Sequence, residues 1–152
     1  MVIRIYRLAR WLYLHRVPLL PKLLKICNRI VFGVVLPPSA VLGARVLLSY
    51  QGLGTVIHQR AEIGDDVLIG AGVTIGGRSG HRQVPVIERN AMIGTGAKVL
   101  GPVRVGQYAS IGANAVVLSD IPAYAVAVGV PARVVRVQDP SEIVDYTDFM
   151  RG

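Results

Sequence analysis

The fold is decided by the stretch IGDDVLIGAGVTIGG, residues 63–77, in which an aliphatic residue returns every six positions. Ile63, Ile69 and Ile75 carry this phase. An α-helix turns every 3.6 residues, so a period of six cannot keep side chains on one of its faces, whereas units of one short strand and one turn can. The same phase continues through Ile57, Ile87, Ile93, Val99, Val105, Ile111 and Val117. Leu42 and Leu48 extend the six-residue spacing upstream, ahead of an interval that is out of register.

Repeats of this kind predict a parallel β-helix, an all-β solenoid. Three units close one triangular coil, and stacked coils form hydrogen bonds at the strand spacing of about 4.8 Å. The countable units predict about four coils with inward-pointing aliphatic residues and with ends that need a cover. A second inward set lies four positions after the first and comprises Val67, Val73, Ala91, Ala97, Val103, Ala109 and Ala115.

Two segments break the six-residue period. The interval from Leu48 to Ile57 is nine residues long, and the interval from Ile75 to Ile87 is twelve. His81 falls where a core aliphatic residue is expected, so the second segment predicts a loop that protrudes from the solenoid. Insertions in solenoids gather on one face and often carry function, so both segments are candidate site regions.

The 152 residues divide into three predicted parts. A helical amphipathic segment takes residues 1–36, the hexapeptide β-helix residues 37–136, and an acidic tail residues 137–152, which either opens with a short helix at Asp139 or is disordered. With 52% hydrophobic and 17% charged residues, the composition excludes a disordered chain. The single Cys27 excludes a disulfide framework and fits a cytoplasmic protein.

Two helices, Val2–Val17 and Leu23–Val35, are predicted in the first part, and Pro18 and Pro21 break the chain between them. Neither helix offers the roughly 20 apolar residues that span a bilayer. No acidic residue precedes Glu62, and the formal net charge is +8. The segment therefore packs on the solenoid or on a partner subunit, lies on the anionic inner face of the membrane, or does both. Nucleic acid is not expected, because no recognition motif accompanies the basic residues.

Four motifs give the sequence a family resemblance. They are GVTIGG at 72–77, IGTGAKVLG at 93–101, IGANAVVL at 111–118 and VGVPAR at 128–133. Together they resemble the hexapeptide-repeat acyltransferases, and within them the serine acetyltransferases. The resemblance implies a left-handed β-helix, a homotrimer, and acetyl-CoA bound without a metal in the groove between neighbouring coils. The implied cofactor contacts are Gly76, Gly77, Gly96, Ala97, Lys98, Ala115 and Arg133.

The acceptor substrate is predicted from the positions at which the sequence differs from the serine acetyltransferases. Serine acetyltransferases carry an Asp-His pair in the first irregular rung, where an ungapped reading puts Tyr50 and Gln51. The short basic helices look more like the polysaccharide-assembly enzymes of the superfamily, including those of the colanic acid type. The prediction is therefore acetyl transfer to a hydroxyl of a sugar, small or lipid-linked, in polysaccharide biosynthesis. The alternatives are serine O-acetylation for cysteine biosynthesis and a non-catalytic trimeric scaffold that has lost the Asp-His pair.

Transfer to a hydroxyl needs a base, because the hydroxyl pKa lies far above 7. The candidate imidazoles are His58 and His81, and the sequence leaves open which is the base. The plainer alternatives are a polar side chain stacked on the rungs for His58 and an ordinary loop histidine for His81. Substrate contacts are expected from Tyr50, Gln51, Arg78 and Arg82.

Overall fold

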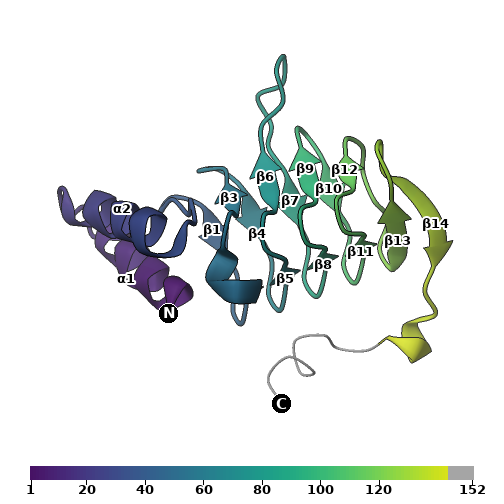
Figure 1. Cartoon of the computed structure of the whole chain (residues 1–152), viewed down its shortest axis with the longest axis horizontal. Helices are drawn as coiled ribbons and strands as arrows, with labels where there is room; N and C mark the ends of the chain where they lie inside the picture. Colours follow the sequence, from purple (N-terminus) through teal and green to yellow (C-terminus); the bar gives the residue numbers. More distant parts are fainter. Residues whose placement is uncertain (144–152) are drawn as a thin grey trace.

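The computed structural model describes residues 1–143, and it places two helices ahead of a solenoid of short strands (Figure 1). The helices are α1 (Val2–Leu14) and α2 (Leu20–Phe32). Each strand of the solenoid is followed by a corner onto the next of three faces, and the chain returns to the first face one coil further along. The predicted parallel β-helix of about four coils is thus confirmed.

Three sheets form the faces, and all of their strands run parallel except the last. The first sheet holds β1 (Val41–Leu42), β4 (Glu62–Ile63), β7 (Val86–Ile87) and β10 (Arg104–Val105). The second holds β2 (Leu47–Leu48), β5 (Leu68–Ile69), β8 (Met92–Ile93), β11 (Ser110–Ile111), β13 (Ala125–Val128) and the antiparallel β14 (Arg133–Val137). The third holds β3 (Val56–Ile57), β6 (Thr74–Gly76), β9 (Lys98–Leu100) and β12 (Val116–Val117). Two short 3-10 helices, η1 (Ser49–Gly52) and η2 (Pro140–Glu142), complete the described chain.

The core is the stack of aliphatic side chains that the six-residue phase predicts. In the second sheet Ile93 pairs with Ile69 on one side and with Ile111 on the other, and all three are buried. The second predicted set is buried as well. Leu48 differs, because it is only half-buried beside η1. The hydrophobic effect therefore stabilises a continuous column of side chains along the solenoid axis.

The two helices end at other residues than the sequence predicts. The first stops at Leu14 rather than Val17, and the second spans Leu20–Phe32 rather than Leu23–Val35. Pro21 does not break the chain, because it lies in the first turn of α2, where its missing N–H costs no helical hydrogen bond. Gly33 ends α2 in the left-handed conformation that favours glycine.

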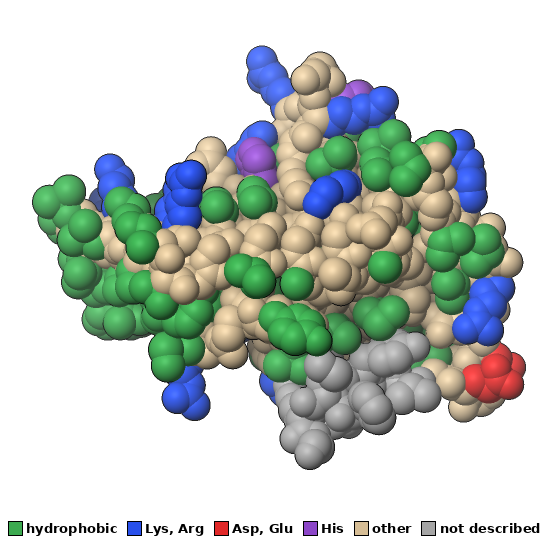
Figure 2. Space-filling view, in the orientation of Figure 1, with side chains coloured by type: hydrophobic (Ala, Val, Ile, Leu, Met, Phe, Trp, Pro, Cys, Tyr) green, Lys and Arg blue, Asp and Glu red, His purple; other side chains and the backbone are tan. Residues whose placement is uncertain are grey.

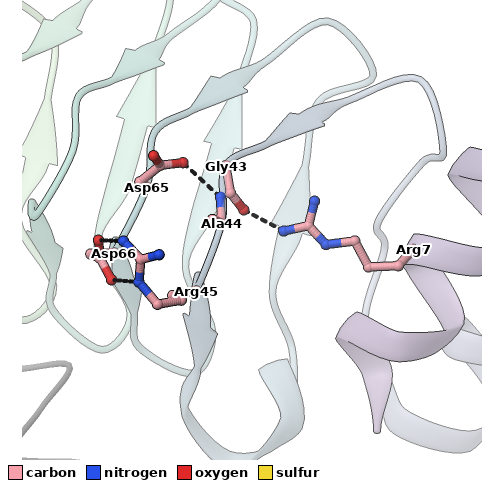
Figure 3. Close-up of polar contacts among 6 residues, drawn as sticks. All are labelled: Arg7, Gly43, Ala44, Arg45, Asp65 and Asp66. Carbon is pink, nitrogen blue, oxygen red and sulfur yellow. Dashed lines mark hydrogen bonds and ion pairs between the residues drawn. The ribbon is translucent and has the colours of Figure 1, made fainter.

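Helix α1 covers the open end of the first coil. The buried hydroxyl of Tyr6 donates to the carbonyl oxygen of Ala40 at 2.6 Å, and burial raises the pKa of that hydroxyl. Arg10 donates to the same carbonyl at 2.8 Å. Arg7 donates to the carbonyl oxygen of Leu42 and to that of Gly43, the second of which Figure 3 shows. Part of the N-terminal positive charge thus satisfies backbone carbonyls at an end that no further coil covers.

Polar side chains also tie consecutive coils together at their corners. Asp65 accepts a hydrogen bond from the backbone N–H of Ala44 at 2.6 Å, and Asp66 forms a two-point pair with Arg45 at 2.5 and 2.7 Å (Figure 3). At the C-terminal side, Asp139 accepts from the backbone N–H of Ser141 at 2.8 Å and begins the short helix η2. The acidic residues at 145 and 148 lie outside the described residues.

Glu88 also connects two consecutive coils, and the pH dependence of its contribution to stability can be predicted. Arg104 on the next coil donates to Glu88 at 2.7 Å, and this hydrogen bond is the main reason that the pKa of Glu88 lies below its ordinary value. A lowered pKa in the folded state contributes stability above the unfolded-state pKa of about 4.3 and loses it as the pH falls through the folded-state value.

Glu88→Gln is therefore expected to lower the free energy of unfolding at pH 7 by only about 0.5 kcal/mol, because the pair is partly exposed. The difference from wild type should vanish at pH values below the folded-state pKa of Glu88. Urea unfolding at several pH values measures this, and a difference that persists in acid would contradict the ion-pair explanation.

Candidate active site

One corner of the solenoid gathers both candidate imidazole segments. It is the corner where the chain passes from the third sheet to the first, which we call the loop corner. His58 follows β3 there, and residues 77–85 follow β6 one coil later. These residues protrude between β6 and β7 in Figure 1, as the twelve-residue interval predicted, and His81 is exposed within them.

His58 faces the start of this loop. Its ring nitrogen Nδ1 accepts a hydrogen bond from the backbone N–H of Arg60 at 3.1 Å. A Cβ atom built on Gly77 would lie 3.9 Å from Cδ2 and 4.0 Å from Nε2 of His58. The imidazole edge that carries Nε2 therefore faces the side of Gly77, the first residue of the loop, on which a side chain would stand.

Arginine residues fix the loop at its base. Arg60 donates from its guanidinium to the carbonyl oxygen of Arg82 at 2.6 Å. The side chain of Arg78 lies over Gly101 on the next coil, so close that a Cβ there would approach Arg78 Cβ to 2.9 Å. Figure 2 shows basic and histidine side chains gathered around the protruding loop. Sequence reasoning missed Arg60, whose role depends on its backbone as much as on its side chain.

Tyr50 and Gln51 lie at a different corner, between the second and third sheets. Both have positive φ inside η1, and Tyr50 is 83% exposed. The side-chain oxygen of Gln51 accepts hydrogen bonds from the amino group of Met1 at 2.7 Å and from the backbone N–H of Val2 at 3.3 Å. Within one chain, Gln51 thus holds the start of α1, and the structure does not bring this pair to His58.

The predicted cofactor contacts are spread over several coils. Lys98 donates from Nζ to the carbonyl oxygen of Gly72 at 2.6 Å, and Arg133 is exposed on β14. Ala97 and Ala115 have buried side chains, and their carbonyl oxygens accept backbone hydrogen bonds from the preceding coil. Their contact with CoA stays a prediction.

A groove of about 550 Å³ follows the outer face of the first sheet, which begins at the loop corner. Its lining includes Glu62 and Val86, the first residues of the two strands that follow His58 and the loop. The groove therefore offers room for a ligand along the first sheet, but neither His58 nor a residue of the loop lines it.

Comparison with known proteins shows the family to which this chain belongs. Residues 85–119 match the family model described as bacterial transferase hexapeptide (six repeats). A serine acetyltransferase of Mycobacterium tuberculosis is 45% identical over 138 residues, which are 90% of this chain and 60% of that protein. A serine acetyltransferase of Helicobacter pylori strain J99 is 41% identical over 133 residues, which are 86% of this chain and 77% of that protein. The chain belongs to the serine acetyltransferase family.

Solved structures agree with this assignment. A serine acetyltransferase in complex with CoA superposes with a TM-score of 0.81 at 39% identity, covering 88% of this chain and 55% of that one. A complex with cysteine gives a TM-score of 0.87 at 36% identity, covering 98% and 57%. The left-handed β-helix of the hexapeptide transferases is thus the fold of this chain. The chain spans 60% of the Mycobacterium tuberculosis relative and 54% of the one from Synechococcus elongatus.

The prediction of a polysaccharide acetyltransferase was wrong. It depended on Tyr50 and Gln51 in place of the Asp-His pair and on the short basic helices. The relatives matched over most of this chain are serine acetyltransferases, and so are the structural neighbours. These comparisons favour the alternative acceptor, serine.

Proposed function

We propose that this protein transfers the acetyl group of acetyl-CoA to the hydroxyl of serine. The observation that carries the proposal is the similarity to serine acetyltransferases over 86–90% of the chain, including one of which it covers 77%. The CoA-bound structural neighbour supports acetyl-CoA as the co-substrate. The imidazole of His58 beside the anchored loop supplies a hydrogen-bonding group to the site.

The working unit that we propose is a homotrimer in the cytoplasm. In one chain, Tyr50 and the loop corner lie on different corners of the triangle. A neighbouring protomer could place its corner between the second and third sheets, which carries Tyr50, against the loop corner. Tyr50 of one protomer would then line one shared site with Arg78 and Arg82 of the other. Sedimentation analysis tests the trimer, and a monomer at working concentration would contradict it.

The proposal is tested by following thiol release from acetyl-CoA in the presence of L-serine. We expect serine-dependent thiol release and O-acetylserine as the product. A protein that binds CoA but releases no thiol with L-serine would instead be the non-catalytic scaffold. That outcome would contradict the proposed activity while leaving the family assignment intact.

We further propose that α2 lies on an anionic lipid surface. No helix in the described part of the chain is long and apolar enough to cross a membrane. The apolar face of α2 is nevertheless turned away from the protein, with Leu23 58% and Ile30 77% exposed, whereas its buried residues are Pro21 and Asn28. In Figure 2 hydrophobic side chains cover this end of the molecule. Lys22, Lys25 and Arg29 flank them.

Charge favours lipid over a second copy of the same helix. No acidic residue precedes Glu62, so two α2 faces in contact would bring like charges together, whereas anionic headgroups would neutralise them. Amphipathic helices with basic flanks bind in this way at the interface.

Replacing Lys22, Lys25 and Arg29 together by Gln is expected to weaken binding to phosphatidylglycerol vesicles by about a hundred-fold, at about 1 kcal/mol for each charge near the surface. Co-sedimentation with vesicles measures this, and Arg136→Gln at the opposite end serves as the control. Concentration-dependent self-association without vesicle binding would overturn the proposal in favour of a second copy.

A further inference from the structure

The hydrogen bond between Arg60 and His58 limits what the imidazole can do. The backbone N–H of Arg60 points at Nδ1 of His58 across 3.1 Å. A backbone N–H can only donate, so Nδ1 must present its lone pair. A neutral imidazole carries one proton, and that proton then sits on Nε2. The ring is therefore a donor at Nε2 and has no free lone pair there to accept a proton.

The corner holds the ring in this orientation. The backbone N–H of His58 donates to Ile75 at 2.8 Å, and its carbonyl accepts from Ala61 at 3.0 Å, so both peptide groups of the residue are fixed. Rotating the ring by half a turn would set Cδ2–H against the N–H of Arg60 and forfeit the hydrogen bond. The Nε2 edge is the one beside Gly77, where the loop begins.

We propose that His58 acts as a hydrogen-bond donor to the reacting carbonyl oxygen and is not the base. The inference rests on the proposed acetyl transfer. The acceptor oxygen forms a C–O bond with the thioester carbon while its proton passes to a second imidazole, that of His81. The carbonyl π electrons move to oxygen, and the resulting oxyanion accepts the hydrogen bond from Nε2. When the C=O bond re-forms, the C–S bond breaks, and the CoA thiolate takes the proton back from the imidazolium.

Arg60 is the positioning residue in this arrangement. Its backbone sets the tautomer of His58, and its guanidinium holds the carbonyl of Arg82, one residue from His81. One residue thereby links the donor to the loop that carries the second imidazole. A hydrogen-bond donor that is held in place before the reaction stabilises the negative charge that develops on the carbonyl oxygen in the transition state.

Three substitutions of His58 separate a donor from a base. The amide nitrogen of Gln reaches roughly the place of Nε2 and can donate, but it cannot take up a proton. We expect His58→Gln to stay within about ten-fold of wild-type kcat, and His58→Ala to fall by about 10²–10³. His58→Asn, whose shorter amide reaches only the place of Nδ1, should resemble His58→Ala. A His58→Gln variant that is folded by circular dichroism and as slow as His58→Ala would overturn the donor role.

A second measurement does not depend on acetyl transfer. Nitrogen-15 NMR of the unliganded protein, with His58→Gln used for assignment, reports which ring nitrogen carries the proton in the neutral form. We expect protonated Nε2 and unprotonated Nδ1. The opposite tautomer would refute the inference even in an active enzyme, whereas the expected tautomer in a protein without activity would refute only the proposed function.

Discussion

Gly94→Ala is expected to lower the free energy of unfolding by about 3 kcal/mol or more, at the upper end of overpacking effects. Gly94 follows β8 and does not need a positive φ; its space is limited by the next coil. A Cβ atom there would lie 2.6 Å from the carbonyl oxygen of Ile111 and 2.7 Å from the backbone nitrogen of Ala113. Both are backbone atoms and cannot rotate away. The added methyl group must therefore push two coils apart and lengthen the 2.8 Å hydrogen bond from Gly94 to Ile111.

Gly76→Ala is the matched control, because it also changes a glycine that follows an aliphatic core residue. A Cβ at Gly76 would meet the end of the Leu100 side chain at 3.4 Å, an ordinary contact. We expect a change within about 1 kcal/mol. Urea unfolding of both variants at one protomer concentration measures the difference. Equal effects would show that backbone contact between coils does not limit these positions.

The six-residue phase was sufficient to predict the core because inward and outward positions are repeated in every coil. Ile69, Ile93 and Ile111 share the inward phase in the sequence, and in the structure they stack in register. A glycine that follows an aliphatic residue can either relieve crowding between coils or permit an unusual φ, and the sequence alone does not distinguish the two. At Gly94 the structure decides for crowding.

Other parts of the fold depend on tertiary contacts that leave no periodic signal. Helix α2 begins before Pro21 because a proline in the first turn loses no hydrogen bond, so the residue type alone could not locate the helix start. The antiparallel strand β14 extends the second sheet beyond the last repeat. Its residues carry no six-residue phase, and the sequence gives no reason to expect a reversal of direction there.

The candidate site likewise has residues that the sequence could reveal and contacts that it could not. His58 and His81 could be singled out because they stand in or beside the two irregular intervals. The contact of Gln51 with the amino group of Met1 joins residues that are distant in sequence, and no motif announces it. The contact of Arg60 with His58 is made by a backbone N–H, which every residue except proline carries. Side-chain identity therefore could not reveal either contact.

His81→Ala is expected to lower kcat by about 10²–10⁴ while the KM for acetyl-CoA changes little. The reason is the state of the other imidazoles. Nδ1 of His58 is engaged by Arg60, and His15 lies at the end of α1, where its Nδ1 contacts the carbonyl of Trp11 at 2.7 Å. Among the residues that the structure describes, His81 is thus the histidine left to take a proton near the loop corner.

The loop around His81 is anchored well enough for that role. Its backbone N–H donates to the carbonyl of Arg78 at 3.1 Å, and the Arg78 side chain rests on Gly101. Gln83→Ala, in the same loop, is the control and should retain wild-type kcat. Steady-state kinetics with L-serine at saturating acetyl-CoA measures both variants. If His81→Ala turned over as fast as Gln83→Ala, the proton would have to pass to a group other than an imidazole of this loop, and the positions of Arg60 and Arg78 would then serve the loop's shape alone.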